Sequence, residues 1–99
     1  MTYYVDIDNT ICRTKGMDYA NAKPIRKHID KMNGLYNLGF DVVYYTSRGV
    51  GSGVDYRELT ERQLRDWGVK YTELRLDKPV FDVLVDDRAV SAEEFFNEI

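Results

Sequence analysis

The sequence predicts a single α/β domain, spanning residues 1–99, that is built on a mainly parallel sheet. Short runs rich in β-branched and aromatic residues alternate along the chain with longer segments whose apolar residues recur at helical spacing. Strands that alternate with helices favour parallel pairing through right-handed crossover connections. The composition, with 43% hydrophobic and 31% charged residues, is typical of one globular domain and not of a disordered chain.

The first part of the chain is expected to hold one strand, one loop and one helix. The strand covers about residues 2–7 and is predicted to be buried. Residues 9–22 have no clear hydrophobic period, so we expect a loop or a small flap. A helix should begin near Pro24, which suits a first helical position, and end at Gly39. Its apolar stripe is formed by Ile25, Ile29, Met32 and Tyr36.

The middle of the chain repeats this pattern. Residues 40–46, FDVVYYT, are typical of a strand, and the loop that follows, SRGVGSG at residues 47–53, contains three glycines. Asp55 can cap a second helix that continues to about Trp67, where Gly68 stops it.

The last third is expected to add two strands and a helix. A short third strand lies within residues 69–76, and VFDVLV at residues 80–85 is typical of a fourth. Ser91 and Glu94 form a capping box for the last helix. The predicted order is therefore strand, helix, strand, helix, strand, strand, helix, with an unusually short third connection.

Composition and charge exclude several classes of partner. The net charge of −3 does not indicate a positively charged surface, so we expect no nucleic-acid binding. The chain has no apolar run long enough to span a bilayer and no signal-peptide pattern, so we expect a soluble cytoplasmic protein without a membrane contact. The single cysteine, Cys12, excludes an internal disulfide and fits a reducing compartment.

Polar side chains collect where the predicted strands end. In parallel sheets, ligands bind at the carboxyl ends of the strands. Residues two apart in a strand face the same side, so one pocket can hold both carboxylates of the first strand end. Carboxylates that lie close together repel each other, and a bound divalent cation removes this repulsion. Oxygen ligands suit Mg²⁺. Zinc is not expected, because the sequence has no cluster of histidine and cysteine residues. The collected residues are Asp6, Asp8, Thr46, Ser47, Arg48, Lys78, Asp86 and Asp87.

Four short motifs resemble those of the haloacid dehalogenase (HAD) superfamily, in the same order and over nearly the whole chain. They are DIDNT from Asp6 to Thr10, VVYYTS around Thr46, KP at Lys78, and VLVDD ending in Asp86 and Asp87. More narrowly, three segments resemble those of small phosphatase-like proteins encoded with bacterial polysaccharide biosynthesis genes: YTSRG, YRELTERQLRDWGVKY and DKPVFDVLVDD. The resemblance implies a three-layer Rossmann-like (HAD-like) fold.

The resemblance also implies a reaction and a role for each residue. The chain would be a Mg²⁺-dependent phosphatase that hydrolyses a small phosphorylated metabolite, such as a sugar phosphate, through an aspartyl-phosphate. Asp6 would be the nucleophile, Asp8 the general acid and base, Thr46 a donor to a phosphoryl oxygen, and Lys78 a charge-balancing cation. The metal ligands would be Asp6, Asp8, Asp86 and Asp87, with Asp8 acting through its carbonyl and Asp87 directly or through water.

The chain is shorter than most members of that superfamily and has no segment long enough for a cap domain. An open site leaves room for a large substrate or for a partner subunit in a homo-oligomer. The loops after the first two strands carry Arg13, Lys15, Ser47 and Arg48. We expect them to form a mobile rim that binds the part of the substrate beyond the phosphate, where an arginine fork suits a carboxylate or a second phosphate.

Three other readings stay open. A receiver-like phosphoacceptor also gathers acidic residues, a hydroxyl and a lysine at strand ends, but its phosphoacceptor aspartate follows a later strand, where this chain has Thr46. A degenerate phosphatase fold used only for binding predicts the loss of a catalytic position, and none is lost. The phosphoryl group can also pass to an acceptor other than water, which would make the protein a phosphotransferase.

Overall fold

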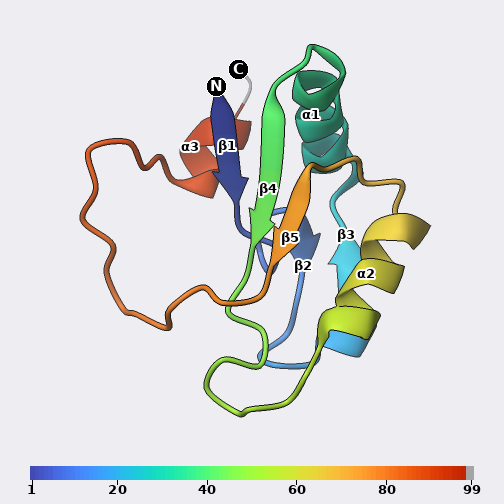
Figure 1. The fold of residues 1–99 in the computed structure, drawn as a ribbon, viewed down its shortest axis with the longest axis vertical. Helices are drawn as coiled ribbons and strands as arrows, with labels where there is room; N and C mark the ends of the chain where they lie inside the picture. Colours follow the sequence, from blue (N-terminus) through green and yellow to red (C-terminus); the bar gives the residue numbers. More distant parts are fainter. Residues whose placement is uncertain (98–99) are drawn as a thin grey trace.

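The computed structural model describes residues 1–97 and contains a three-stranded parallel sheet (Figure 1). Its strands are β1 (Thr2–Val5), β4 (Asp41–Tyr45) and β5 (Glu73–Arg75), in the order β1-β4-β5. Thr2 pairs with Asp41, and Val43 pairs with Glu73. The middle strand is therefore β4, the most hydrophobic of the three. The predicted parallel α/β architecture is confirmed for these strands.

The small flap expected after the first strand is present. It contains β2 (Cys12–Arg13), the 3₁₀ helix η1 (Tyr19–Asn21) and β3 (Lys23–Pro24). β2 and β3 pair in antiparallel fashion, with Cys12 opposite Pro24. Because Pro24 belongs to this pair, the helix that was expected to start there begins two residues later.

Three helices follow the predicted positions closely. They are α1 (Arg26–Asn37), α2 (Arg57–Asp66) and α3 (Ala92–Phe96). Gly39 and Gly68, which follow the first two, have positive φ angles of 98° and 68° and stop the helices as expected. The predicted cap of the last helix is confirmed, because the Ser91 side chain accepts a hydrogen bond from the backbone of Glu94.

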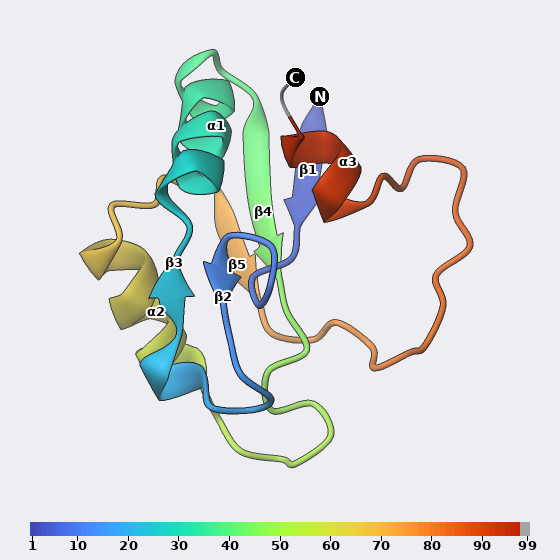
Figure 2. The same ribbon diagram turned by 180° about the vertical axis from the view of Figure 1, so that it is seen from behind.

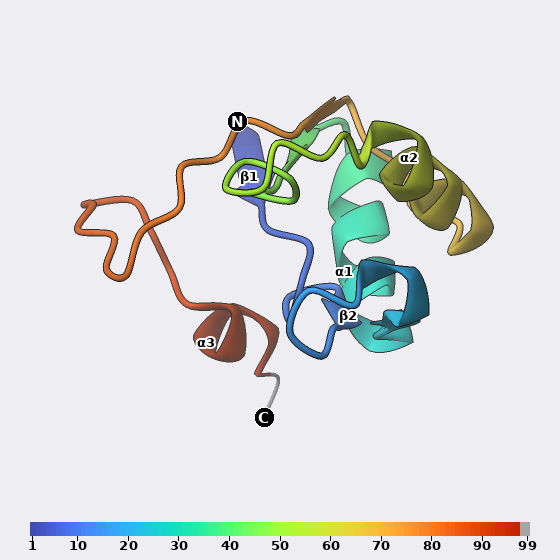
Figure 3. The same ribbon diagram turned by 90° about the horizontal axis from the view of Figure 1, so that it is seen from below.

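Helices α1 and α3 lie on the same face of the sheet, and α2 lies beside the β5 edge (Figure 3). No helix crosses the opposite face of the sheet in Figure 1. Tyr4 is 57% exposed and packs edge-on against Tyr45. The described residues thus form two layers, and the expected three-layer arrangement is not observed.

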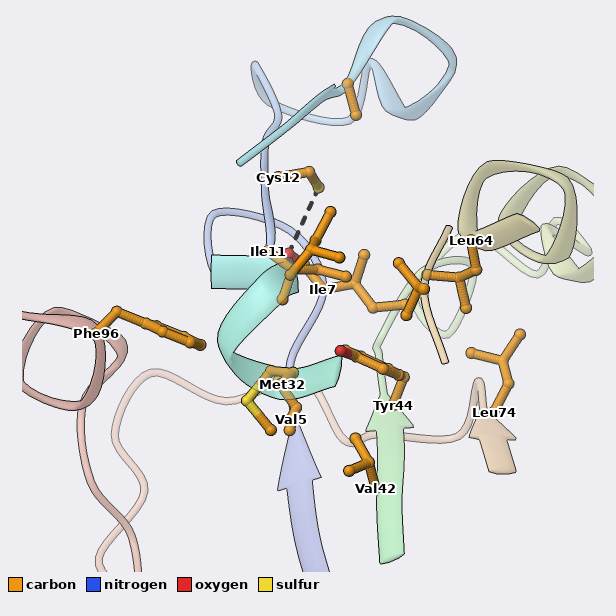
Figure 4. Close-up of a cluster of buried hydrophobic side chains, with 13 residues drawn as sticks. Val5, Ile7, Ile11, Cys12, Met32, Val42, Tyr44, Leu64, Leu74 and Phe96 are labelled. Atoms are coloured by element: carbon orange, nitrogen blue, oxygen red, sulfur yellow. Dashed lines mark hydrogen bonds between the residues drawn. The ribbon is translucent and has the colours of Figure 1, made fainter. Parts of the chain in front are cut away.

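The core lies between the sheet and α1 (Figure 4). Alternation along the strands sends Val42 and Tyr44 of β4 inward, where both side chains have no exposed surface. Met32 of α1 and Ile7 meet them there, also fully buried. Ile7 lies between the two aspartates of the first strand end, so burying it orients the backbone that carries them.

The predicted fourth strand is wrong. Residues 80–85 contain no strand, and the chain from residue 77 to residue 91 forms a long irregular excursion away from the sheet (Figures 1 and 2). Val83, Leu84 and Val85 are 77%, 57% and 92% exposed. A run of β-formers becomes a strand only when a neighbouring strand accepts its backbone hydrogen bonds. In residues 1–97, β1 pairs only with β4, so its outer edge has no such partner.

Candidate functional site

Three of the predicted catalytic residues meet at the carboxyl end of the sheet. Asp6 follows β1, Thr46 follows β4, and Lys78 lies three residues beyond β5. The Lys78 backbone N–H donates to the Thr46 carbonyl oxygen at 3.2 Å. This bond places the Lys78 side chain over the end of β1, where its Nζ lies 3.5 Å from Asp6 Oδ1.

Asp6 is the more accessible of the two aspartates. Its side chain is 37% exposed, and Thr10 Oγ1 donates to Oδ2 at 3.4 Å. The Thr10 hydroxyl comes from the tight turn after β1, where the Thr10 and Ile11 backbone N–H groups both donate to the Ile7 carbonyl oxygen. Asp6 therefore presents a carboxylate that is oriented by a hydroxyl, paired with a cation, and still open to solvent on one side.

Asp8 has very different surroundings. Arg48 donates to both of its oxygens, from Nε to Oδ2 at 2.9 Å and from Nη2 to Oδ1 at 2.8 Å. Thr14 Oγ1 donates to Oδ1 at 2.6 Å. A carboxylate that accepts three such bonds is held in one orientation.

Arg48 is buried, with 2% of its surface exposed. Its Nη1 donates to Thr60 Oγ1 at 3.1 Å and to Gln63 Oε1 at 2.6 Å, both on α2. The ring of Tyr19 covers the guanidinium at 4.8 Å. The expectation that Arg48 lies on a mobile, solvent-facing rim is therefore wrong. A buried guanidinium needs hydrogen-bond partners, and Asp8, Thr60 and Gln63 supply them here.

The turn after Arg48 is tight and requires glycine. Gly49 has φ of +83°, and a Cβ at this position would lie 2.0 Å from the Val54 carbonyl oxygen. Only glycine fits so close an approach of the backbone. The glycine-rich loop thus turns sharply directly after Arg48.

The other predicted substrate-binding residues differ from one another in how deeply they are buried. Thr46 is 1% exposed, and its Oγ1 accepts a hydrogen bond from the Arg48 backbone at 3.2 Å. Ser47 is half-buried, whereas Arg13 in β2 and Lys15 after it are exposed on the flap. Of this set, Thr46 is bonded to Lys78 through its backbone carbonyl oxygen.

The predicted metal-ligand set of Asp6, Asp8, Asp86 and Asp87 is not assembled. Asp86 and Asp87 lie in the irregular excursion and are exposed, and Asp86 Oδ1 accepts from the Arg88 backbone at 2.7 Å. Within residues 1–97, no group of three or more acidic, histidine or cysteine side chains could hold a metal ion. The residues as arranged do not fit a Mg²⁺ site. A fourth strand in the sheet would have placed Asp86 and Asp87 beside Asp6 and Asp8, and residues 80–85 do not form that strand.

A large cavity adjoins the site. Its volume is about 1070 Å³, and it lies between β1, the excursion and α3. Asp6 and Lys78 line it, together with Asp86 and Arg88. Most of the remaining wall is apolar, contributed by residues such as Tyr3, Phe81, Leu84 and Phe95. A ligand in this cavity would meet charge at the Asp6–Lys78 pair and hydrophobic surface elsewhere.

Four polar partners of Arg48 and Asp8 were not predicted from the sequence as site residues: Thr14, Tyr19, Thr60 and Gln63. Thr60 and Gln63 share the buried face of α2 with Leu64. A polar residue on the apolar face of an amphipathic helix is the signal that could have identified these two.

Burial and the Asp8 charge change the titration of two neighbouring groups. Burial raises the pKa of the Cys12 thiol, and the nearby Asp8 carboxylate raises it further, whereas the contact with Thr14 opposes this. The pKa of Tyr19 is raised by burial and then by Asp8. Both groups stay protonated near neutral pH, so neither supplies a nucleophile to the site.

Within residues 1–97, no helix has the length and apolar character needed to cross a membrane.

No protein-family model matches the chain, and no curated protein sequence matches it. A crystal structure of a structural-genomics target from Vibrio cholerae is similar, with a TM-score of 0.88 and 26% sequence identity. The similarity covers 99% of this chain and 89% of that one. The comparison supports the α/β fold with its parallel sheet over almost the full length of the chain.

Proposed function

We propose that this protein is a phosphatase that hydrolyses a small phosphomonoester through an aspartyl-phosphate on Asp6. The observation that carries the proposal is the pair of Asp6 and Lys78, 3.5 Å apart at the carboxyl end of a parallel sheet and open to a cavity. A nucleophilic carboxylate must be accessible, and a phosphoryl group needs a cation beside it. Both conditions are met at this pair.

The chemistry requires two steps. An Asp6 oxygen forms a bond to phosphorus while the bond from phosphorus to the ester oxygen breaks, and the leaving alcohol takes up a proton. Water then attacks the phosphorus of the aspartyl-phosphate, which releases inorganic phosphate and restores the Asp6 carboxylate. Lys78 balances the negative charge of the phosphoryl oxygens in both steps. Asp8 is the group that moves the proton, since it is the other carboxylate at the end of β1.

Sugar phosphates are the first substrates to test, because parts of the sequence resemble proteins of bacterial polysaccharide biosynthesis. The requirement for Mg²⁺ stays a prediction from the sequence. No step above is assigned to a metal, because the described residues do not form a site for one.

The direct test is a phosphate-release assay over sugar phosphates, nucleotides and p-nitrophenyl phosphate, with Mg²⁺ and with EDTA. Asp6→Asn should abolish turnover and also the acid-stable label left on the protein after a rapid quench with ³²P-labelled substrate. Asp41→Asn is the matched control, because Asp41 is an exposed aspartate at the other end of β4. Label on any residue other than Asp6 would refute the assignment. Full activity in EDTA would refute the Mg²⁺ prediction alone.

A phosphoacceptor or binding module without turnover is the second candidate. It is favoured by the Arg48 pair, which together with Thr14 engages both oxygens of Asp8, so that proton transfer has only the second lone pair of Oδ2 to use. This alternative predicts stoichiometric labelling or binding of phosphate with no release of product. The same rapid-quench experiment separates the two, because a phosphatase releases many equivalents of phosphate per chain.

A further inference from the structure

We propose that Arg48 is a positioning residue for the reaction: it holds the Asp8 carboxylate in the orientation needed for proton transfer and does not bind substrate. The inference rests on the proposed phosphatase function. It adds a role for Arg48 that differs from the rim predicted from the sequence.

The first argument is the geometry of the pair. Nε and Nη2 of Arg48 each face one oxygen of Asp8, at 2.9 and 2.8 Å. A planar fork that bonds both oxygens fixes the plane of the carboxylate, which a single hydrogen bond does not do. Thr14 Oγ1, at 2.6 Å from Oδ1, adds a third fixed point.

The second argument is that Arg48 itself is anchored. Its remaining terminal nitrogen is bound by Thr60 and Gln63, and the Tyr19 ring lies over the guanidinium. Gln63 Nε2 in turn donates to the Tyr19 carbonyl oxygen at 2.6 Å. The orientation of Asp8 is therefore set by α2 and η1, two elements that lie outside the sheet. A catalytic group is effective when such supporting contacts hold it within a fraction of an ångström.

The third argument is accessibility. The Arg48 side chain has no exposed surface, whereas the Asp8 side chain is 20% exposed. Arg48 can therefore reach a substrate only through Asp8. The exposed residue of the pair is the one that can meet a leaving group, and the buried residue is the one that orients it.

The test is a double-mutant cycle on kcat and KM, with the best phosphomonoester of the panel. Asp8→Asn should lower kcat by about 10²–10⁴-fold, because it removes the proton-transfer group. Arg48→Lys keeps the positive charge but loses the pair of N–H groups that bind both oxygens of Asp8. We therefore expect kcat to fall by about 10–100-fold with KM unchanged. In the double variant, kcat should equal that of Asp8→Asn, because Arg48 acts only through Asp8.

A second readout uses the leaving group. p-Nitrophenolate leaves without a proton, so Arg48→Lys and Asp8→Asn should both lose less activity with p-nitrophenyl phosphate than with an alkyl phosphate. A purely structural loss would lower both activities equally. Thr60→Val removes one hydrogen-bond partner of Arg48 while keeping the shape of the side chain, and it should show the same pattern more weakly. This variant replaces Arg48→Lys in the test if Arg48→Lys does not fold.

The matched control is Arg75→Lys. Arg75 also binds an aspartate with its fork, through Nε to Asp77 at 3.1 Å and Nη2 at 2.7 Å, but this pair is exposed. Arg75→Lys should leave kcat and KM unchanged. Additive effects of Arg48→Lys and Asp8→Asn, or a raised KM with kcat unchanged, would overturn the positioning role while the phosphatase stands. A wild-type chain without turnover would overturn both.

Discussion

Removing the Tyr44 hydroxyl tests how the core is organised. Tyr44 lies on the middle strand and has no exposed surface, and its hydroxyl has no hydrogen-bond partner within residues 1–97. The ring packs edge-on against Tyr71, with 6.2 Å between centroids. A buried polar group without a partner lowers stability by about 1–3 kcal/mol. We therefore expect Tyr44→Phe to raise the free energy of unfolding.

The size of the gain follows from two opposing terms. Removing the hydroxyl relieves about 1–3 kcal/mol of desolvation cost. The space left by one oxygen is on the order of 10 Å³ and costs about 0.2–0.3 kcal/mol at roughly 24 cal/mol per Å³. The net gain is about 0.7–2.8 kcal/mol, and each 1 kcal/mol raises Tm by about 4–8 °C in a domain of this size. Urea titration and a thermal melt at pH 7 measure both quantities.

The same substitution should change the response to alkaline pH. Burial raises the pKa of Tyr44 above its ordinary value of 10.0. The folded chain therefore keeps this proton at a pH where the unfolded chain has lost it, so stability falls as pH rises above about 10. Tyr44→Phe has no group to ionise, and its advantage over the wild type should grow between pH 9 and pH 11.

Tyr36→Phe is the control, because Tyr36 is 38% exposed on α1 and should change stability by less than about 0.5 kcal/mol. A loss of 1 kcal/mol or more in Tyr44→Phe would refute the reasoning, since it would mean that the hydroxyl makes a favourable bond.

Two further predictions concern other parts of the core. Phe96→Ala should lower the free energy of unfolding by about 3–5 kcal/mol, because Phe96 is buried and stacks on His28 with 4.1 Å between centroids. Phe81→Ala, at a 44% exposed position, is its control in the same denaturation experiment, and equal losses would contradict the packing of α3. Cys12 should react with iodoacetamide at pH 8 far more slowly in the folded chain than in urea, because its thiol is fully buried and its raised pKa leaves little thiolate. Equal rates, measured by mass spectrometry, would show that the flap opens freely.

Local patterns determined much of the fold. The strands at residues 2–5 and 41–45 and the helices at residues 26–37 and 57–66 follow from hydrophobic periods and from glycine stops that act within a few residues. The Ser91 cap is a contact between residues three apart, so the sequence contains both partners in one short stretch. The positions of Asp6 and Thr46 at strand ends follow from the same local signals.

The tertiary structure decided which of these polar residues meet. Arg48 and Asp8 are 40 residues apart in the chain, and nothing local distinguishes a loop arginine that binds substrate from one that is buried against an aspartate. Residues 80–85 have the composition of a strand, yet pairing requires a partner edge, and the structure leaves this run exposed. Local propensity acts between neighbours in sequence. Ion pairs, sheet edges and metal-ligand sets depend on how distant segments pack. In residues 1–97 that packing joined Lys78 to Asp6 but did not bring Asp86 and Asp87 into a metal-ligand group with Asp6 and Asp8.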